Sequence, residues 1–509
     1  MRLFTLACLT LALPALAQDV TAYNKGLAAY NANNFDEAAR LFYEVASFTG
    51  DNALRFKAEY YQASSFQRAG LPFSALISFT PIVEAGPSHP YHLKAVEALL
   101  SLQETLHDNY VIPKLLNKHY DKFADAWATL PLEVLARINY LIGRISYLNG
   151  LLEDSKQFLE AVPDSSQFYA RAQYLLGLTL ADPRFPAASD ELRRRNVERS
   201  IEVFEGVLAI KTEQLDFKDT THLTYLALGR TNYNLGEFQK SVEWYERVPR
   251  FSRFWEQALF ENGFARFQND DLGGGLGSLQ GLHAPQFEGA FQPESWILTA
   301  TIYYFSCLYD EARASLAEFE KRYLPMAEKL KPIIESDPKD LVRFYTLVSQ
   351  PEGDAIPKPV LNSVRSTSLM VDLFNMLTEI EKEKALVNAK ESWRVAKLSP
   401  DLVSSLDQNK STLVRAAGKE SAKKLREAYA SVRGFTDKAE IIRFEVSKAE
   451  KELAETGVDT HALLDGQTLY RPAMPAENWN YWKFQGEFWR DEIGYYQYTL
   501  RRGCPAPRD

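Results

Sequence analysis

The sequence has few cysteines, few histidines and no long apolar run in its interior. Its 509 residues include 3 Cys and 7 His, and the formal net charge at pH 7 is -9. A small disulfide-rich scaffold would need more cysteines, so a hydrophobic core must stabilise this fold. A nucleic-acid partner would require a basic surface, which this acidic composition does not predict. No stretch is long enough to predict a transmembrane segment.

Motifs that carry catalysis are also missing. The histidines lack HExxH spacing, and no G-x-S-x-G elbow is present. His89 and His92 lie in a Pro-rich turn, where we expect exposed side chains. The glycines of 273–278 lack the lysine and hydroxyl of a phosphate-binding loop, so they predict a tight, close-packed inter-helix turn. We therefore expect no catalytic residue, no metal site and no cofactor, and a protein that is not an enzyme.

The N-terminus has the features of a secretory signal peptide over residues 1–17. Arg2 is followed by an apolar run at 3–13 and by the small-residue site at 15–17. Cys8 lacks the surrounding sequence of a lipoprotein signal. The signal predicts a periplasmic protein and leaves outer-membrane association open. After its removal Cys307 and Cys504 remain, and they can either form a disulfide or stay as free buried thiols.

Residues 18–325 contain a degenerate repeat. Apolar residues make up 46% of the whole chain, which is enough to fill a helical core. The repeat has a small residue in a first helix, a second small residue 12 positions later, and a large residue four positions after that. Its first small residues are Gly26, Ala63, Gly143, Gly177, Gly229, Gly263 and Ala300. The second are Ala38, Ala75, Ser155, Ser200, Ser241, Gly275 and Ala312. The large residues are Phe42, Phe79, Leu159, Phe204, Tyr245, Leu279 and Leu316.

This spacing resembles the tetratricopeptide repeat family. The pair Gly177 and Ser200 departs from it, because residues near 182–195 look inserted. The resemblance implies antiparallel helix pairs that approach at the small residues and stack into a right-handed solenoid. The aromatic position of the family is displaced by one residue, to Tyr30, Tyr147 and Tyr233, and these rings belong either to the core or to the inner groove.

Family members bind peptides or folded partners along the surface formed by their first helices. The resemblance therefore implies a partner-binding groove in which arginine and tyrosine side chains suit acidic or carboxylate-bearing ligands. The residues at the corresponding positions are Tyr140, Arg144, Tyr147, Arg230, Tyr233, Asn234 and Phe267.

Residues 326–460 predict long helices. A heptad seam runs through Leu425, Ala428, Val432, Phe435, Ala439, Ile442, Val446, Ala449 and Leu453. An earlier, less complete seam covers 369–387, and Ser399–Pro400 is expected to break the helix between the two. We expect a helical hairpin or small coiled-coil bundle. The alternative is a dimerisation coiled coil that would give a homo-oligomer.

Residues 461–509 form an aromatic-rich tail, in which 479–498 read WNYWKFQGEFWRDEIGYYQY. This segment resembles the closing segment of periplasmic repeat proteins of gliding and predatory proteobacteria. It can cap the apolar end of the array, as terminal units of solenoids do, or form an aromatic recognition patch with Arg490, Asp491 and Glu492 at its rim.

Together these features predict a periplasmic scaffold or adaptor that binds other envelope proteins or peptides in a motility, secretion or outer-membrane biogenesis assembly. The alternative is a cell-wall or glycan-binding envelope protein whose aromatic tail stacks on sugars. No nucleic-acid partner is expected.

Overall fold

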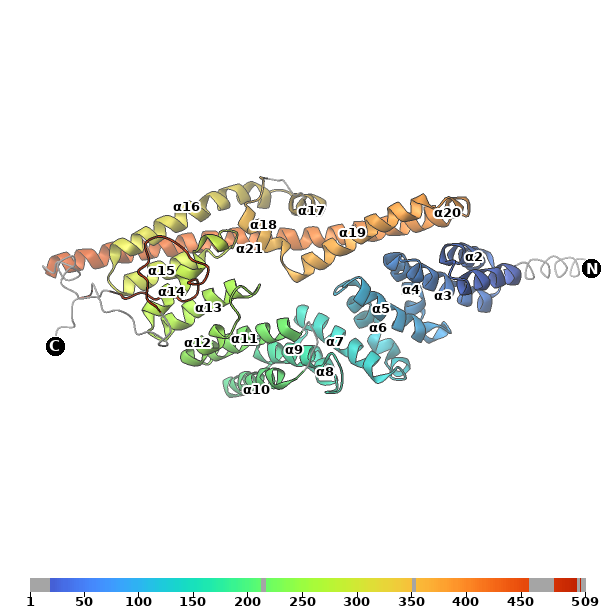
Figure 1. The fold of residues 1–509 in the computed structure, drawn as a ribbon, viewed down its shortest axis with the longest axis horizontal. Helices are drawn as coiled ribbons and strands as arrows, with labels where there is room; N and C mark the ends of the chain where they lie inside the picture. The colour runs from blue at the N-terminus through green and yellow to red at the C-terminus, as the bar shows by residue number, and fades with distance from the viewer. Residues whose placement is uncertain (1–18, 212–216, 350–353, 457–479, 501–503, 505–509) are drawn as a thin grey trace, which may run out of the picture. The chain divides into compact units, whose positions relative to one another are not determined.

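The computed structural model describes residues 19–211, 217–349, 354–456, 480–500 and 504. Every regular element within these ranges is a helix, which confirms the predicted all-helical fold class (Figure 1). The helices form two compact units, each made from two stretches of chain. Unit 1 consists of residues 1–172 and 367–418, and unit 2 consists of residues 173–366 and 419–509. None of the described helices is both long and apolar enough to span a membrane.

Unit 1 begins with helical residues 19–31 and continues through helices joined by short turns. These are α2 (Phe35–Phe48), α3 (Asn52–Arg68), α4 (Pro72–Ala85), η1 (Gly86–Ser88), α5 (His92–Thr105), α6 (Val111–Trp127), α7 (Leu132–Leu148) and α8 (Leu152–Glu160). The next helix, α9 (Tyr169–Ala181), runs across the boundary into unit 2. The second stretch of unit 1 supplies α19 (Ser368–Ala389), α20 (Glu391–Val395) and the first part of α21 (Leu398–Thr456).

Unit 2 continues the series and ends with the tail. Its helices are α10 (Asp190–Ala209), α11 (Phe217–Asn234), α12 (Phe238–Glu246), α13 (Trp255–Gln268), α14 (Leu272–Leu282), η2 (Pro285–Phe287), α15 (Glu294–Phe305), α16 (Tyr309–Ile334), α17 (Leu341–Ser349), α18 (Lys358–Arg365) and the remainder of α21. The predicted domain boundary between 325 and 326 falls inside α16, so the structure divides the chain elsewhere. The predicted signal at 1–17 lies outside the described residues.

In five repeats the first small residue is a glycine that packs against the large residue of the same helix pair. A Cβ added to Gly229 would lie 2.4 Å from the Tyr245 ring, and one added to Gly177 would lie 2.4 Å from the Phe204 ring. The same close approach joins Gly26 to Phe42, Gly143 to Leu159 and Gly263 to Leu279. At Gly177 and Gly229 an added Cβ would overlap the ring, so the low helix propensity of glycine is offset there by the packing of the paired helices.

The first helices of the repeat also share one type of C-terminal turn. Seven positions after the small residue, the backbone has a positive φ at Asn33, Gly70, Gly150, Gly236, Asp270 and Cys307. At Cys307, the N–H of this residue donates to the Tyr304 carbonyl at 2.9 Å, and the Leu308 N–H donates to the Tyr303 carbonyl at 2.9 Å. This pair of bonds is the Schellman motif, which satisfies the last carbonyl groups of a helix. The turn starts the second helix at a fixed place in six of the seven repeats, the exception being that of Gly177.

The heptad seam of α21 is covered within the chain. In unit 2, Val432, Ala439 and Val446 are buried against α16, which lies beside α21 in Figure 1. Arg443 forms an ion pair with Glu320 of α16 at 2.6 Å. The seam is therefore paired with α16, rather than with the earlier seam of 369–387.

The earlier seam forms a helical hairpin in unit 1. Lys384 of α19 pairs with Asp407 of α21 at 2.5 Å, and Glu381 pairs with Lys410 at 2.8 Å, which is the order expected for antiparallel helices. The predicted break at Ser399–Pro400 is displaced, because the chain turns before it and Pro400 occupies the first turn of α21. Proline is tolerated there because the first helical N–H groups have no intrahelical acceptor.

The hairpin is joined to the repeat helices of unit 1 by a distant helix cap. The N-cap residue of α4, Leu71, has no side chain that can accept a hydrogen bond. The carboxylate of Glu383 in α19 takes this role and accepts from the backbone N–H of Phe73 at 2.5 Å and of Ser74 at 2.8 Å. The Ser74 hydroxyl donates to it as well, at 2.5 Å.

Candidate functional site

The predicted groove residues of unit 1 lie on α7 and are partly used inside the unit. Arg144 donates to the Asn109 carbonyl at 3.1 Å and to the Ser368 hydroxyl at 3.4 Å. The Tyr140 ring stacks on Phe168, with 5.6 Å between ring centroids. Tyr147 is half-buried.

Arg144 stands beside two buried carboxyl groups. Asp108 caps α6 by accepting from the N–H groups of Tyr110, Val111 and Ile112 at 2.7, 2.8 and 2.6 Å. Burial raises the pKa of Asp108, while these N–H groups and Arg144 act to lower it. Burial also raises the pKa of Asp372 to about 6, against the opposing effects of Asn109 and Arg144. Arg144 therefore supports unit 1 electrostatically.

The predicted groove residues of unit 2 lie on α11 and α13. Arg230 forms hydrogen bonds with both carboxylate oxygens of Glu261, at 2.6 to 3.0 Å, while its side chain stays 48% exposed. Tyr233 is half-buried beside Phe238, and Asn234 is exposed. Phe267 packs near Phe305, with 5.9 Å between ring centroids.

The seven residues thus fall into two sets, three in unit 1 and four in unit 2. In both sets the arginine is bound to groups of the chain itself. A ligand carboxylate would have to share or displace these groups, and Arg230 is the one already oriented by a bidentate partner.

A different part of unit 2 contains a large cavity, which the sequence did not indicate. It has a volume of about 1150 Å³ and lies between the tail at 480–499 and α12, α13 and α14. Its apolar and aromatic lining includes Val248, Trp255, Leu259, Tyr481, Trp482, Phe484, Tyr495 and Tyr496. Its polar lining includes Arg247, Arg250, Asn262, Arg266, Ser278, Gln280, Glu487, Asp491 and Glu492.

The glycines of α14 hold the tail that encloses this cavity. A Cβ on Gly277 would lie 1.7 Å from the Tyr496 carbonyl oxygen, and one on Gly273 would lie 2.3 Å from that of Tyr498. The Tyr498 N–H donates to the Gly273 carbonyl at 3.2 Å. Gly273 and Gly277 are one helical turn apart, so they present a single face to the tail backbone. The predicted inter-helix turn is corrected: these glycines are helical, and the turn precedes them at Asp270, which has φ 60°.

One tail residue completes the core of unit 2. Ile493 is fully buried in a cluster with Trp255, Leu282 and Val248. Gly494 has φ 93°, and a Cβ there would lie 2.6 Å from the Trp255 ring. The part of the tail around Ile493 therefore covers the surface of α13 and α14, which are not the last helices of the repeat series.

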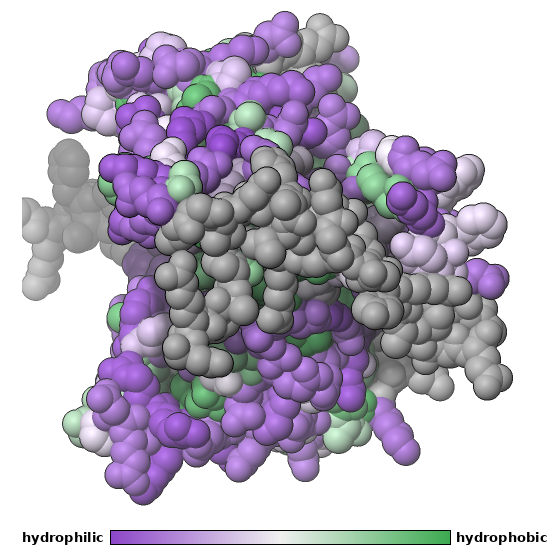
Figure 2. All heavy atoms as spheres, turned by 90° about the vertical axis from the view of Figure 1, so that its left-hand side faces the viewer, coloured by the Kyte–Doolittle hydropathy of each residue, from purple (hydrophilic) through white to green (hydrophobic). Residues whose placement is uncertain are grey.

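Other tail residues remain exposed. Trp482 is 77% exposed, Trp489 is 59% exposed and Tyr481 is 45% exposed. The face drawn in Figure 2 is mainly hydrophilic, with small separate hydrophobic areas. Burial and aromatic exposure therefore occur at different residues of the tail.

Two arginines fix the rim of the tail. Arg250 donates to the backbone carbonyls of Arg490 and Asp491, both at 2.9 Å, and its guanidinium lies 4.3 Å from the Tyr495 ring centroid. The Arg490 guanidinium lies 4.8 Å from the Phe251 ring centroid. These contacts position the 490–495 segment against the turn that precedes α13.

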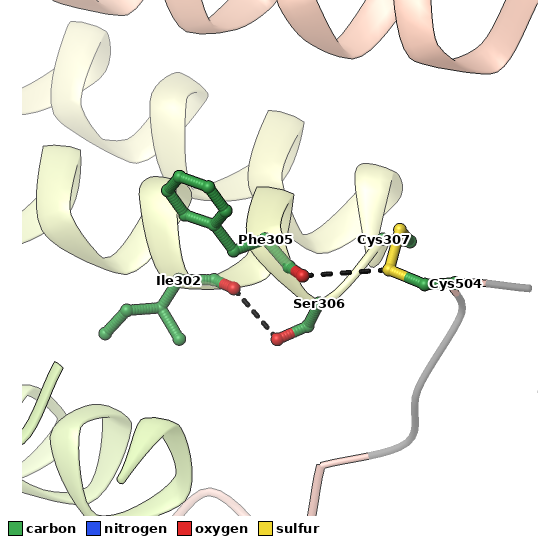
Figure 3. The surroundings of a disulfide bond; sticks show 5 residues. All are labelled: Ile302, Phe305, Ser306, Cys307 and Cys504. Carbon is green, nitrogen blue, oxygen red and sulfur yellow. Dashed lines mark hydrogen bonds between the residues drawn. A yellow bond between two sulfur atoms is a disulfide. The ribbon is translucent and has the colours of Figure 1, made fainter. Parts of the chain in front are cut away.

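The tail is also connected to the helices by a disulfide between Cys307 and Cys504, with 5.0 Å between the Cα atoms (Figure 3). The Cys504 sulfur lies 3.7 Å from the Phe305 carbonyl oxygen. Cys307 occupies the left-handed position of the repeat turn after α15, where three other repeats have glycine and two have Asn33 and Asp270. Of the two states considered from the sequence, the structure has the disulfide.

The expectation of exposed histidines is wrong. His89 is 3% exposed and His92 is 2% exposed. The Trp127 indole N–H donates to His92 Nε2 at 2.8 Å, and burial lowers the pKa of His92. Phe56 of α3 lies against His89, with 4.7 Å between ring centroids, and Trp127 of α6 lies against His92. These contacts are made with other helices, so the local sequence was misleading. Within the described ranges, no group of three His, Cys, Asp or Glu residues could hold a metal ion.

No protein-family model matches the chain. No curated protein matches it either.

Proposed function

We propose that this chain is an exported scaffold of the tetratricopeptide-repeat type that holds other proteins or peptides of a bacterial cell envelope. Its helices would stack as a right-handed solenoid, and its action would be binding without catalysis. The observation that carries the proposal is the Schellman turn, found at one repeat position from Asn33 to Cys307. Together with the glycine contacts, this turn supports a chain built from one repeated helix pair.

A repeated helix pair favours a binding role for a physical reason. Each pair packs mainly on its neighbours, so the array has a large surface relative to its core. Arg230 is exposed on such a surface and is held by Glu261. Its remaining N–H donors can bind a carboxylate of a partner in a fixed orientation.

The disulfide supports an extracytoplasmic location. Structural disulfides persist in the periplasm and are rare in the reducing cytosol. The signal-like sequence at 1–17 favours the same compartment. The proposed scaffold does not form a homo-oligomer through the α21 seam, because α16 of the same chain covers that seam.

The proposal can be tested by crosslinking the full chain in its native cells and identifying the captured proteins by mass spectrometry. Arg230→Ala should reduce the recovery of the partner set by about tenfold, the effect of losing roughly 1.4 kcal/mol of binding free energy. The matched control is Arg194→Ala, because Arg194 forms an exposed pair with Glu198 at 3.0 Å on α10. Equal recovery of partners with the unchanged chain, Arg230→Ala and Arg194→Ala would contradict the proposed groove. Recovery no greater than from a strain that lacks the chain would contradict the scaffold function.

A further inference from the structure

We propose that two copies of this chain associate through the outer face of α21, with the two α21 helices antiparallel. The outer face is the side of the helix that points away from the seam covered by α16. Self-association through this face does not depend on the proposed partner-binding groove, which lies on other helices.

The outer face is a second series of three- and four-residue steps along α21. All of its members are exposed: Gly434, Asp437, Ile441, Phe444, Lys448, Lys451 and Glu455. Residues two positions apart on a helix point about 200° apart. Ile441 and Phe444 are each two positions from a buried seam residue, Ala439 and Val446, so the series runs along the opposite side of the helix.

Two ion pairs mark the edges of the outer face. Arg443 pairs with Glu320 of α16 at 2.6 Å, and Lys438 pairs with Glu294 of α15 at 3.2 Å. At 3.6 residues per turn, Arg443 and Lys438 project to opposite sides of the outer face. The neighbouring helices α15 and α16 are therefore bound at its edges and do not extend across it.

The centre of the outer face is apolar. Phe444 is 66% exposed and Ile441 is 62% exposed, and the structure describes no other exposed large apolar residue on α21. Residues three apart on a helix are neighbours, so these two side chains form one patch. Contact with an apolar surface would remove this patch from water, which is favourable.

The charges beside the patch fit a second copy of the same helix. Asp437 lies about one turn before Ile441, and Lys448 lies about one turn after Phe444. If Ile441 lies opposite Phe444 of the second copy in an antiparallel pair, Asp437 lies opposite Lys448 of that copy. Two-fold symmetry repeats each of these contacts, so the pair has two apolar contacts and two contacts of opposite charge.

The parallel arrangement is unfavourable by the same reasoning. It would place Asp437 opposite Asp437 of the second copy and Lys448 opposite Lys448, and like charges in an interface repel. Within its own chain Lys448 has a contact with Glu445 at 4.0 Å, which is exposed and contributes little. The Lys448 ammonium can therefore turn toward a carboxylate of the second copy.

The ends of the antiparallel arrangement are also compatible. Gly434 lies opposite Lys451 of the second copy, and a Cβ added to Gly434 would have nothing within 4 Å. The bare backbone at Gly434 leaves room for the long Lys451 stem to lie across it. The contact extends over about five helical turns of each copy, which is a small interface. We therefore expect a reversible dimer with a Kd of about 1–100 µM.

The first measurement is sedimentation velocity of the full chain between about 1 and 200 µM. The unchanged chain should shift from the mass of one chain to that of two as its concentration rises. Phe444→Ala should raise the dimer Kd by about tenfold or more, because it removes the largest apolar contact. Phe444 is largely exposed, so the variant should keep its fold, which circular dichroism would check.

A charge exchange tests the antiparallel register. Asp437→Lys alone and Lys448→Asp alone each place like charges at both charged contacts, so each should raise the Kd by about tenfold or more. An equimolar mixture of the two variants restores opposite charges at both contacts. The mixture should therefore form a dimer with a Kd within about threefold of that of the unchanged chain.

Lys382→Asp on α19 is the matched control. Lys382 is 62% exposed and follows its ion-pair partner Glu379 by three residues, as Lys448 follows Glu445. This variant should dimerise with a Kd within about twofold of that of the unchanged chain. Arg230→Ala should also dimerise normally, so failure of the partner-binding groove and failure of the dimer are distinguishable.

Three outcomes would overturn the inference. The first is a monomer at every concentration, which would leave the outer face to a partner of different sequence or to another segment of the same chain. The second is a dimer that Phe444→Ala leaves unchanged. The third is a mixture of the Asp437→Lys and Lys448→Asp variants that remains as monomeric as each variant alone, because Asp437 and Lys448 would then not lie opposite each other.

Discussion

The carboxylate of Glu383 accepts hydrogen bonds from both the backbone N–H and the hydroxyl of Ser74, at 2.8 and 2.5 Å. Glu383 is fully buried, and Ser74 lies in the first turn of α4. A helix N-terminus has unpaired N–H groups and a partial positive charge, and a carboxylate neutralises both. This single side chain therefore connects the α19–α21 hairpin to the repeat helices of unit 1.

Glu383→Ala should destabilise unit 1 by about 2–3 kcal/mol, because buried N–H groups would lose a charged acceptor. The measurement is urea unfolding followed by circular dichroism. Glu381→Ala is the control on the same helix, since its exposed ion pair with Lys410 should contribute less than about 1 kcal/mol. Similar losses in the two variants would show that the cap is unimportant.

The stability of unit 1 should depend on pH through the same group. Burial, opposed by the bonds from Ser74 and Phe73, raises the pKa of Glu383 from 4.5 to about 7. The folded state then binds this proton more tightly than the unfolded state, so stability should fall as pH rises from about 4.5 to about 7. Urea unfolding at the two ends of this range measures the slope, and Glu383→Gln should reduce it. A rise in stability over this range would mean that the N–H groups hold the carboxylate ionised.

Gly277→Ala should displace the tail from α14. The added methyl would meet the Tyr496 carbonyl oxygen at 1.7 Å, and neither backbone can move without losing its packing. We expect a loss of about 1–3 kcal/mol and faster cleavage of the tail by protease. The control is Gly434→Ala in α21, where nothing lies within 4 Å and alanine should stabilise the helix by up to about 1 kcal/mol. Unchanged protease resistance of the Gly277 variant would contradict the seating of the tail.

Gly229→Ala tests the repeat packing. Its Cβ would lie 2.4 Å from the Tyr245 ring, so α11 and α12 would have to separate. We expect a destabilisation of about 1–3 kcal/mol in thermal unfolding. Gly206→Ala in α10 has free space and should be neutral or stabilising, which separates crowding from the general effect of replacing a helical glycine.

Cys504→Ser should lower the stability of unit 2 alone. The disulfide closes a loop with a sequence separation of 197 residues, and its loss should cost about 2–4 kcal/mol. Calorimetry with and without reductant would show which thermal transition moves. We expect reductant to lower the transition temperature of the unchanged chain to that of the Cys504→Ser variant. If neither the reductant nor the substitution lowers it, the tail is held by its other contacts.

The contacts of the repeat were predictable because they are local in sequence. A small residue and a large one at fixed spacing, such as Gly229 and Tyr245, encode their own contact. The seating of the tail was not predictable, because Gly277 and Tyr496 are far apart and no periodicity links them. For the same reason the sequence did not assign a partner to the α21 seam, since nothing local distinguishes α16 from α19. His89 and His92 show the opposite error: a Pro-rich local sequence suggested exposure, but Phe56 packs against His89 and Trp127 against His92.

The two-part composition of unit 1 has a consequence for the order of synthesis. Ser74 precedes its capping partner Glu383 by 309 residues. At about 5–20 residues per second, a ribosome makes the second long after the first, with a delay of roughly 15–60 s. During that interval α4 exists without its acceptor, and the helices of unit 2 are made before unit 1 can close. The first-made segment of this chain is therefore among the last to complete its fold.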